Sequence, residues 1–222
     1  MIIAIDGPAA SGKSTVAKAV ARRLDVRHLD TGAMYRAVAW LALEEGILLD
    51  DLTSLAELAS ANPVAFDYAH GAPVATSVRI AGRDITSAIR SPEVDAAVSP
   101  VAAVHGVRTA LVAQQRTLAD ARDTVVEGRD IGTVVFPHAE VKVFLTASAA
   151  ERARRRQLDL AAQGHAVEQA EVRSRLERRD HIDSTREASP LEAATDAELL
   201  DTTGLSVEEV VDAIVARVEA AR

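Results

Sequence analysis

The segment at residues 7–14 restricts the fold of this chain more than any other part of its sequence. It matches the pattern G-x-x-x-x-G-K-[ST] in full and reads Gly7-Pro8-Ala9-Ala10-Ser11-Gly12-Lys13-Ser14. In this pattern the glycines let the backbone curl, so that successive N–H groups point at phosphate oxygens. A short apolar run at residues 2–5 precedes the segment, and apolar residues at helical spacing follow it. The sequence therefore predicts a strand, a phosphate-binding loop and a helix.

A chance glycine-rich turn that caps a helix is the alternative to a nucleotide-binding loop. The expected strand before the segment and the expected helix after it favour the nucleotide-binding loop, because that loop requires both. We therefore expect ATP or GTP to bind here. Lys13 would reach the β- and γ-phosphates, and the Ser14 hydroxyl would contact Mg²⁺.

The loop alone leaves the acceptor of the phosphoryl group open, because GTPases, motor ATPases and small-molecule kinases share it. The sequence has no Asn-Lys-x-Asp segment for guanine selection, and 222 residues are few for a motor ATPase with its additional regions. A small-molecule kinase is therefore favoured. The alternative from another class is a nucleotide-dependent switch that hydrolyses ATP to control a partner.

Charge and cysteine content narrow the setting of the chain. Its 33 acidic and 25 basic residues give a formal net charge of −8, which argues against broad adhesion to nucleic acid or anionic membranes. Any phosphate site must then be a local basic pocket. The sequence has no cysteine, no secretory signal pattern and no apolar run near the roughly 20 residues that span a bilayer. We expect a cytoplasmic monomer without nucleic-acid or membrane partners.

Apolar runs separated by helical patterns predict an α/β fold. After the strand at residues 2–5, strands are expected at 124–127, 141–146 and 198–201, and helices near 100–121, 149–163, 168–186 and 206–221. Strands spaced by helices imply a parallel sheet covered on both faces. Prolines and glycines between residues 62 and 86 interrupt this rhythm and separate two alternating stretches, 64–68 and 74–80. A small antiparallel insert is predicted there, either as a cover for a substrate or as a surface excursion without a role.

Two further stretches resemble the signature segments of bacterial cytidylate kinases. They read Asp30-Thr31-Gly32-Ala33-Met34-Tyr35-Arg36 and Glu127-Gly128-Arg129-Asp130-Ile131-Gly132-Thr133-Val134-Val135-Phe136-Pro137. The resemblance implies a three-layer P-loop fold of the nucleoside monophosphate kinase group. Its core would comprise residues 1–61 and 87–222 with a short helical lid at about 149–186, and residues 62–86 would form the lobe that binds the monophosphate. It also implies phosphorylation of CMP and dCMP by ATP with Mg²⁺, in pyrimidine nucleotide metabolism.

The resemblance assigns residues to both substrates. The ATP-binding set is Gly7, Pro8, Ala9, Ala10, Ser11, Gly12, Lys13, Ser14, Thr15 and Arg152. The expected catalytic cations are Lys13, Arg129, Arg155 and Arg156, of which the last two share a helix face with Arg152. A solvated helix face is the alternative for each of these three arginines.

On the acceptor side the resemblance implies that Arg36, Arg129 and Arg186 hold the phosphate of CMP. It further implies that Ser99, Arg108 and Asp130 read the cytosine, that Arg179 and Asp183 lie beside the sugar, and that Thr31 joins this set. Arginine suits phosphate because its guanidinium binds in a forked manner and stays charged. The alternatives are a solvated charge for Arg36 and Arg108, an ion pair with Asp130 or Glu127 for Arg129, a helix cap before Pro100 for Ser99, and a salt-bridged surface face for Arg179 and Asp183.

Asp6 ends the first strand and would either approach Mg²⁺ through water or form a turn. The six histidines show no ligand spacing, so no structural metal is assigned to the protein.

In the expected reaction the phosphate oxygen of the acceptor attacks the γ-phosphorus in line without a general base, because this oxygen is already anionic. A kinase for UMP, AMP or shikimate is the nearest rival.

Overall fold

A parallel sheet is the centre of the fold in this computed structural model, which describes residues 1–120, 122–162 and 164–222. Its described strands are β1 (Ile2–Asp6), β2 (Arg27–Asp30), β6 (Thr124–Glu127), β7 (Val141–Thr146) and β8 (Glu198–Asp201), in the order β2-β6-β1-β7-β8. All pairs in this sheet are parallel. The carboxyl ends of the strands therefore meet at one edge of the sheet.

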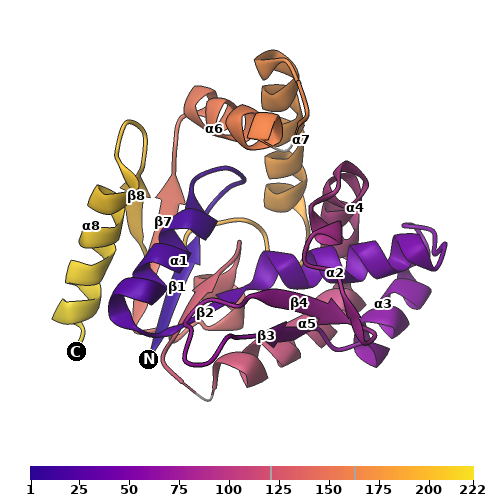
Figure 1. Ribbon diagram of the computed structural model, residues 1–222, viewed down its shortest axis with the longest axis horizontal. Coiled ribbons are helices and arrows are strands. Elements are labelled where there is room, and N and C mark those ends of the chain that lie inside the picture. Colours follow the sequence, from indigo (N-terminus) through magenta and orange to yellow (C-terminus); the bar gives the residue numbers. More distant parts are fainter. Residues whose placement is uncertain (121, 163) are drawn as a thin grey trace.

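Helices cover both faces of the sheet and its carboxyl edge (Figure 1). One face packs against α1 (Lys13–Leu24) and α8 (Val207–Ala220), and the other against α2 (Thr31–Glu44), α3 (Leu52–Ala61), α4 (Pro92–Ala103) and α5 (His105–Ala119). The remaining pair, α6 (Ala149–Ala162) and α7 (Gln169–Thr185), stands above the carboxyl edge. The predicted three-layer α/β fold is confirmed.

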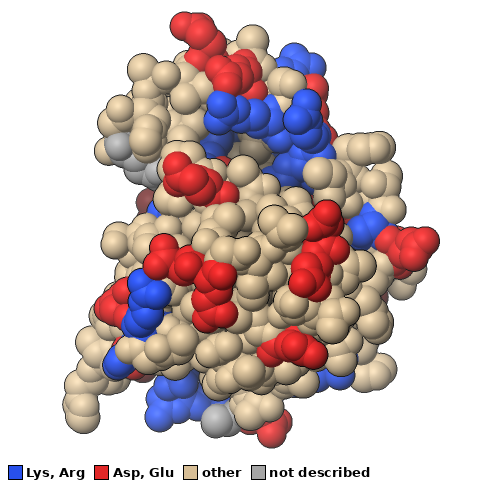
Figure 2. All heavy atoms as spheres, turned by 90° about the vertical axis from the view of Figure 1, so that its right-hand side faces the viewer, with Lys and Arg blue, Asp and Glu red and all other residues tan. Residues whose placement is uncertain are grey.

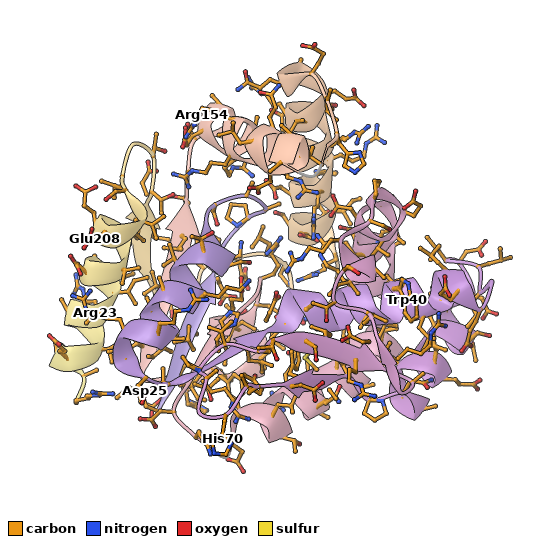
Figure 3. The ribbon with its side chains drawn as sticks, viewed as in Figure 1. Arg23, Asp25, Trp40, His70, Arg154 and Glu208 are labelled. Carbon is orange, nitrogen blue, oxygen red and sulfur yellow. The ribbon has the colours of Figure 1, made fainter. Side chains whose placement is uncertain are left out.

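The strand β1 illustrates how the sequence specifies these layers. Ile3 and Ile5 are buried against α1 and α8, whereas Ala4 between them is buried against the helices of the opposite face. Successive side chains of a strand point to opposite faces, so an uninterrupted apolar run requires cover on both sides. At the rim of this layer, Arg23 of α1 reaches Asp212 of α8, 3.3 Å away (Figure 3).

The small antiparallel sheet is also confirmed. It consists of β3 (Ala65–Asp67), β4 (Ser77–Ile80) and β5 (Arg83–Asp84). It is fastened to the main body by the Arg27 guanidinium, 4.1 Å from the Tyr68 ring centre, and by the Arg83 guanidinium, 4.4 Å from that of Trp40 (Figure 3). A 3-10 turn (Ala88–Arg90) then leads into α4, and a π-helical turn (Ile131–Val135) follows β6.

Most predicted elements lie within two residues of their observed bounds, but two parts of the prediction failed. The expected helix ends at residues 121 and 163 lie outside the described residues. Strand β2 and helices α2 and α3 were not predicted. Strand β2 reads Arg-His-Leu-Asp and has neither an apolar run nor strict alternation, so the parallel register with β6 decides its conformation.

The start of the helical region before residue 104 was predicted wrongly. Helix α4 begins at Pro92, and the Ser91 side chain caps it by accepting from the Val94 N–H at 3.3 Å. Ser99 therefore lies inside this helix and is not its cap. The dipeptide Ser-Pro, a typical helix start, occurs at 91–92 and again at 99–100, and the sequence prediction took the second copy. Helix α5 follows at an angle of 94°.

No single helix in the described ranges is both long and apolar enough to cross a membrane; α4 and α5 meet this criterion only when counted together, across their bend.

Gly106 gives a test of the packing between α3 and α5. A Cβ at this position would lie 2.4 Å from the Ala56 Cβ. We expect Gly106→Ala to lower the free energy of unfolding by about 1–3 kcal/mol through overpacking, measured by urea denaturation. The Ala56→Gly control removes the opposing methyl and should cost about 1 kcal/mol alone. The double variant should lose less free energy of unfolding than the two single variants lose together. Losses that simply add would contradict the contact.

Candidate active site

A cleft of about 1930 Å³ opens at the carboxyl edge of the sheet. Residues of the phosphate-binding loop and α1 line one side, α2 and α4 line another, and α6 and α7 lie above it. Lys and Arg side chains gather in the upper part of the face in Figure 2, at the level of α7. A local basic region therefore exists in a chain whose formal net charge is −8.

Most of the predicted site residues line this one cleft. From the donor set these are Ala9, Ala10, Ser11, Gly12, Lys13, Ser14, Thr15, Arg155 and Arg156. The acceptor set is complete and comprises Thr31, Arg36, Ser99, Arg108, Arg129, Asp130, Arg179, Asp183 and Arg186. Gly7, Pro8 and Arg152 are not among the lining residues, and neither is any residue of the insert at 62–86. The roles assigned to all these residues stay predictions.

The path of the loop depends on two glycines. Gly7 has φ +144°, and a Cβ at this position would lie 2.1 Å from the Leu145 carbonyl oxygen of β7. Gly12 has φ +94° and is the N-cap of α1, where no side chain accepts from the backbone. Helix N–H groups without a side-chain partner form an anion site, which the helix dipole strengthens.

Lys13 closes the loop from within. Its buried Nζ donates to the Pro8 carbonyl oxygen at 2.5 Å and to Ser11 Oγ at 3.3 Å. Burial lowers the pKa of Lys13 well below its ordinary value, and the charge of Arg129 acts in the same direction. An anion in the cleft would offset this loss of hydration.

Glu127 links the loop to the sheet. Its Oε2 accepts from Ser14 Oγ at 2.6 Å, and its Oε1 lies 2.9 Å from His28 Nε2. Burial would raise the pKa of Glu127, but the hydrogen bonds from His28 and Ser14 and the charge of Lys13 hold it below its ordinary value. The sequence analysis named Glu127 only as an alternative ion-pair partner of Arg129 and gave it no part in the phosphate site. Its position at the end of a strand, followed by Gly128, was the available signal.

These oxygens fit a hard divalent cation. Ser14 uses its proton in the bond to Glu127, so its lone pairs stay available, and both residues line the cleft. In the described ranges no group of three or more His, Cys, Asp or Glu side chains forms a metal cluster. Ser14 with Glu127 therefore fits Mg²⁺ that phosphates and water would also hold.

Asp95 and Asp183 bind the arginines of the cleft. The carboxylate of Asp95 accepts from Arg36 at 2.6 Å, Arg156 at 2.7 Å and Arg179 at 3.3 Å. Asp183 accepts from Arg129 Nε at 3.2 Å. Burial and then the nearby charges of Arg129 and Arg36 lower the pKa of Arg179 to about 10.

These contacts decide the alternatives that the sequence left open for Arg36 and Arg129. Arg36 is not a solvated charge, since it is mostly buried and paired with Asp95. Arg129 is ion-paired, but with Asp183 rather than with Asp130 or Glu127. Arg186 lies one residue beyond α7, where its guanidinium is 3.8 Å from Asp130 and 4.0 Å from Asp183. Arginines distant in sequence thus lie together through shared carboxylates.

A second ion pair forms the inner wall of the cleft. Arg108 donates to Asp130, and both side chains are about 95% buried. Arg108 therefore does not lie on a solvated face. The Tyr35 ring lies 5.4 Å below the Arg108 guanidinium, and Ser99 is nearly buried in the same wall. Donors and acceptors in a concave wall suit the edge of a small heterocycle.

The three arginines of α6 that the sequence analysis singled out do not act as one set. Arg152 donates to the Ala9 carbonyl oxygen at 3.2 Å and pairs with Asp180 outside the cleft lining. Arg155 donates to the Ser11 carbonyl oxygen at 3.3 Å and to the Thr202 carbonyl oxygen at 2.7 Å. Both therefore brace the phosphate-binding loop, whereas Arg156 alone reaches across to Asp95. The sequence prediction gave Asp180 and Thr202 no role, because their partners lie far away in the chain.

Asp6 holds the segment after β6. Its two carboxylate oxygens accept the N–H groups of Ile131 and Gly132, each at 2.8 Å. Burial raises its pKa to about 6, although these hydrogen bonds act in the opposite direction. Asp6 thus joins the end of β1 to the turn that carries Arg129 and Asp130.

The family profile described as Cytidylate kinase matches residues 3–220. The chain is 50% identical over 220 residues to a Cytidylate kinase of Pelotomaculum thermopropionicum (strain DSM 13744 / JCM 10971 / SI), covering 99% of this chain and 96% of that one.

A second relative is longer than this chain. The identity is 54% over 214 residues to a Bifunctional pantoate ligase/cytidylate kinase of Synechococcus sp. (strain JA-2-3B'a(2-13)), covering 96% of this chain. The chain spans only 40% of that relative's length.

Among solved structures, the Shikimate Kinase from Bacteroides thetaiotaomicron has a TM-score of 0.50 and 12% sequence identity. That likeness covers 99% of this chain and 98% of that one, and it supports the fold alone.

The raised pKa of Asp6 predicts a pH dependence. The pKa of Asp6 is about 6 in the folded chain, against an ordinary value of 3.8. The Asp6 carboxyl therefore makes its full contribution to stability below about pH 3.8. It is lost as the pH rises through 6. Wild type should therefore lose about 2 kcal/mol relative to Asp6→Asn between pH 4.5 and 7.5, measured by urea denaturation at both pH values. A constant difference between the two proteins would refute this.

Proposed function

This chain belongs to the cytidylate kinase family, and we propose that it transfers the γ-phosphoryl group of ATP to CMP and dCMP. The resemblance of the two signature stretches is thereby confirmed at the level of the family. One observation supports the activity most directly. A phosphate-binding loop and a separate group of arginines line the same cleft, and a nucleotide-dependent switch would need only the loop.

The donor side would hold the phosphates of ATP. The N–H groups of the loop and the charge of Lys13 would bind the β- and γ-phosphates. Mg²⁺ would be held by Ser14 with Glu127 and would neutralise charge on the phosphates. Arg155 would hold the loop in place through its hydrogen bond to Ser11. Arg156 would separate from Asp95 and contact the transferred phosphoryl group.

The acceptor side would hold the phosphate of CMP between Arg36, Arg129 and Arg186, with Arg179 and Asp183 beside the sugar. A phosphate monoester carries nearly two negative charges, so several guanidinium groups are needed to offset its loss of hydration. Asp130 would accept from the exocyclic amine of cytosine, while Arg108 and Ser99 would donate to the ring nitrogen or the carbonyl. Uracil presents a carbonyl in place of this amine, so Asp130 would face an acceptor where cytosine presents a donor.

The transfer itself would need no general base. An oxygen of the CMP phosphate forms the new bond to the γ-phosphorus, and the bond from that phosphorus to the β–γ bridging oxygen breaks, which leaves ADP. Because the attacking oxygen is already anionic, the protein contributes position and positive charge. Closure of α6 and α7, the proposed lid at about 149–186, would exclude water. A covering role for the insert at 62–86 would require a closed state, since none of its residues lines this cleft.

We place this reaction in pyrimidine nucleotide metabolism. A cysteine-free chain suits the reducing cytoplasm, and we expect a monomer, since each cleft contains both groups of cations.

A panel of acceptors tests the proposal. Coupled detection of ADP with CMP, dCMP, UMP, AMP and shikimate should give rates for CMP and dCMP well above the others. Arg108→Ala should lower kcat/KM for CMP by about 100-fold, because the pocket loses a base-edge donor and Asp130 loses its close ion-pair partner. Arg23→Ala, an exposed control, should leave it unchanged. ADP formation that no acceptor increases would instead support the nucleotide-dependent switch.

Lys13 should affect turnover more than binding. Lys13→Ala should lower kcat by about 100-fold or more, while calorimetry should still detect CMP binding, because Lys13 acts on the donor phosphates. The control is Lys18→Ala on the same helix, with a far smaller expected effect on kcat. An unchanged kcat in Lys13→Ala would contradict the donor assignment.

A further inference from the structure

Asp95 is the centre of an ion-pair cluster that joins opposite sides of the cleft. Its partners come from three elements, with Arg36 on α2, Arg156 on α6 and Arg179 on α7. The nitrogen–oxygen distances are 2.6, 2.7 and 3.3 Å, respectively. Asp95 itself belongs to α4 and lines the cleft. One carboxylate therefore connects the acceptor wall to the helix pair above it.

The charge within this cluster is not balanced. Three guanidinium groups and one carboxylate leave a formal surplus of two positive charges, which is similar in magnitude and opposite in sign to the charge of a phosphate monoester dianion. All four side chains are between 18% and 27% exposed, so water screens them only in part. Burial would raise the pKa of Asp95, but Arg36, Arg179 and Arg156 lower it to about 2. Asp95 therefore keeps its negative charge at neutral pH.

We propose that Asp95 is an internal stand-in for the substrate phosphates. It gathers Arg36, Arg156 and Arg179 before the substrates bind, and then gives up Arg36 to the acceptor phosphate, Arg156 to the transferred phosphoryl group and Arg179 to the bound acceptor. This inference rests on the proposed function. It adds a residue that positions the arginines and that also competes with the substrate for them.

The exchange follows from the groups that Asp95 now occupies. Asp95 accepts a hydrogen bond from a terminal guanidinium nitrogen, Nη1 or Nη2, of each of its three partners. These nitrogens are the forked donors that bind phosphate best. A phosphate has more charge and more acceptor oxygens than a carboxylate, so it is the stronger partner. A carboxylate left about 4 Å from a phosphate would repel it substantially. Asp95 must therefore separate from the arginines when the acceptor phosphate arrives.

Such a competitor would have two effects. It would keep three mutually repelling arginines near their working positions in the free protein, which reduces the reorganisation needed on binding. It would also weaken the affinity for phosphate-bearing ligands, which favours release of the nucleoside diphosphate. Because Arg156 and Arg179 belong to α6 and α7, the exchange would also couple the acceptor to the lid.

Asp95→Asn is the decisive variant. Calorimetry should show CMP binding about tenfold tighter than in wild type, with a steeper loss of affinity as salt rises. Cytidine, which lacks the phosphate, should bind within about twofold of wild type. Glu93→Gln removes a charge from the same turn of α4, but no basic side chain in the described ranges lies within ion-pair distance of Glu93. This control should change CMP affinity far less. Unchanged or weaker CMP binding in Asp95→Asn overturns the proposal.

A second measurement needs no variant and applies even if Asp95→Asn does not fold. In a crystal structure of the wild-type chain with CMP, the contact of Arg36 with Asp95 should be replaced by a contact of Arg36 with the phosphate. Retention of all three Asp95 contacts beside a bound phosphate overturns the proposal. The two hypotheses can also fail separately. Wild type that binds CMP no better than cytidine contradicts the proposed function, whereas clear CMP preference with no effect of Asp95→Asn contradicts only the role of Asp95.

Discussion

The path of the backbone between β1 and α1 is the constraint on which the cleft depends. Gly7 lies so close to the Leu145 carbonyl oxygen that no side chain fits there, and Gly12 begins α1 without a side-chain cap. The sheet therefore holds the loop from below, while the amides of the helix stay open above it. Arg155 and Thr202 add hydrogen bonds to the Ser11 carbonyl oxygen. A preorganised anion site results from backbone geometry that side chains reinforce.

Around this loop, the protein balances its cations with its own carboxylates. Asp183 holds Arg129, Asp130 holds Arg108, and Asp95 holds three arginines from three helices. Unpaired charges in a partly buried cleft would be costly and would repel one another. An acidic chain can therefore present a basic cleft, because acidic partners fix the arginines without cancelling their total charge.

The sequence was most informative where chemistry and local pattern coincide. The loop, four strands of the main sheet and the arginines that line the cleft followed from short motifs, either by mechanism or by resemblance. The prediction failed where distant contacts decide the outcome. Strand β2 has no pattern of its own and forms through its register with β6. The roles of Asp95, Asp180 and Thr202 depend on partners that only folding brings near. The wrong helix start at Ser99 came from choosing between two copies of the dipeptide Ser-Pro, of which only the first is followed by acidic residues in the first turn, Glu93 and Asp95.

The bend between α4 and α5 determines more than the course of the chain. Ser99 and Arg108 are nine positions apart, and in one straight helix they would be separated by about 14 Å along its axis. The turn of 94° at Val104 instead directs both toward a single wall. The distance between the backbone positions of these two residues is thus determined by a corner of the main chain. Redesign of this wall for a larger ligand would have to change this angle as well, because substitution of the two side chains leaves the distance between their backbone positions unchanged.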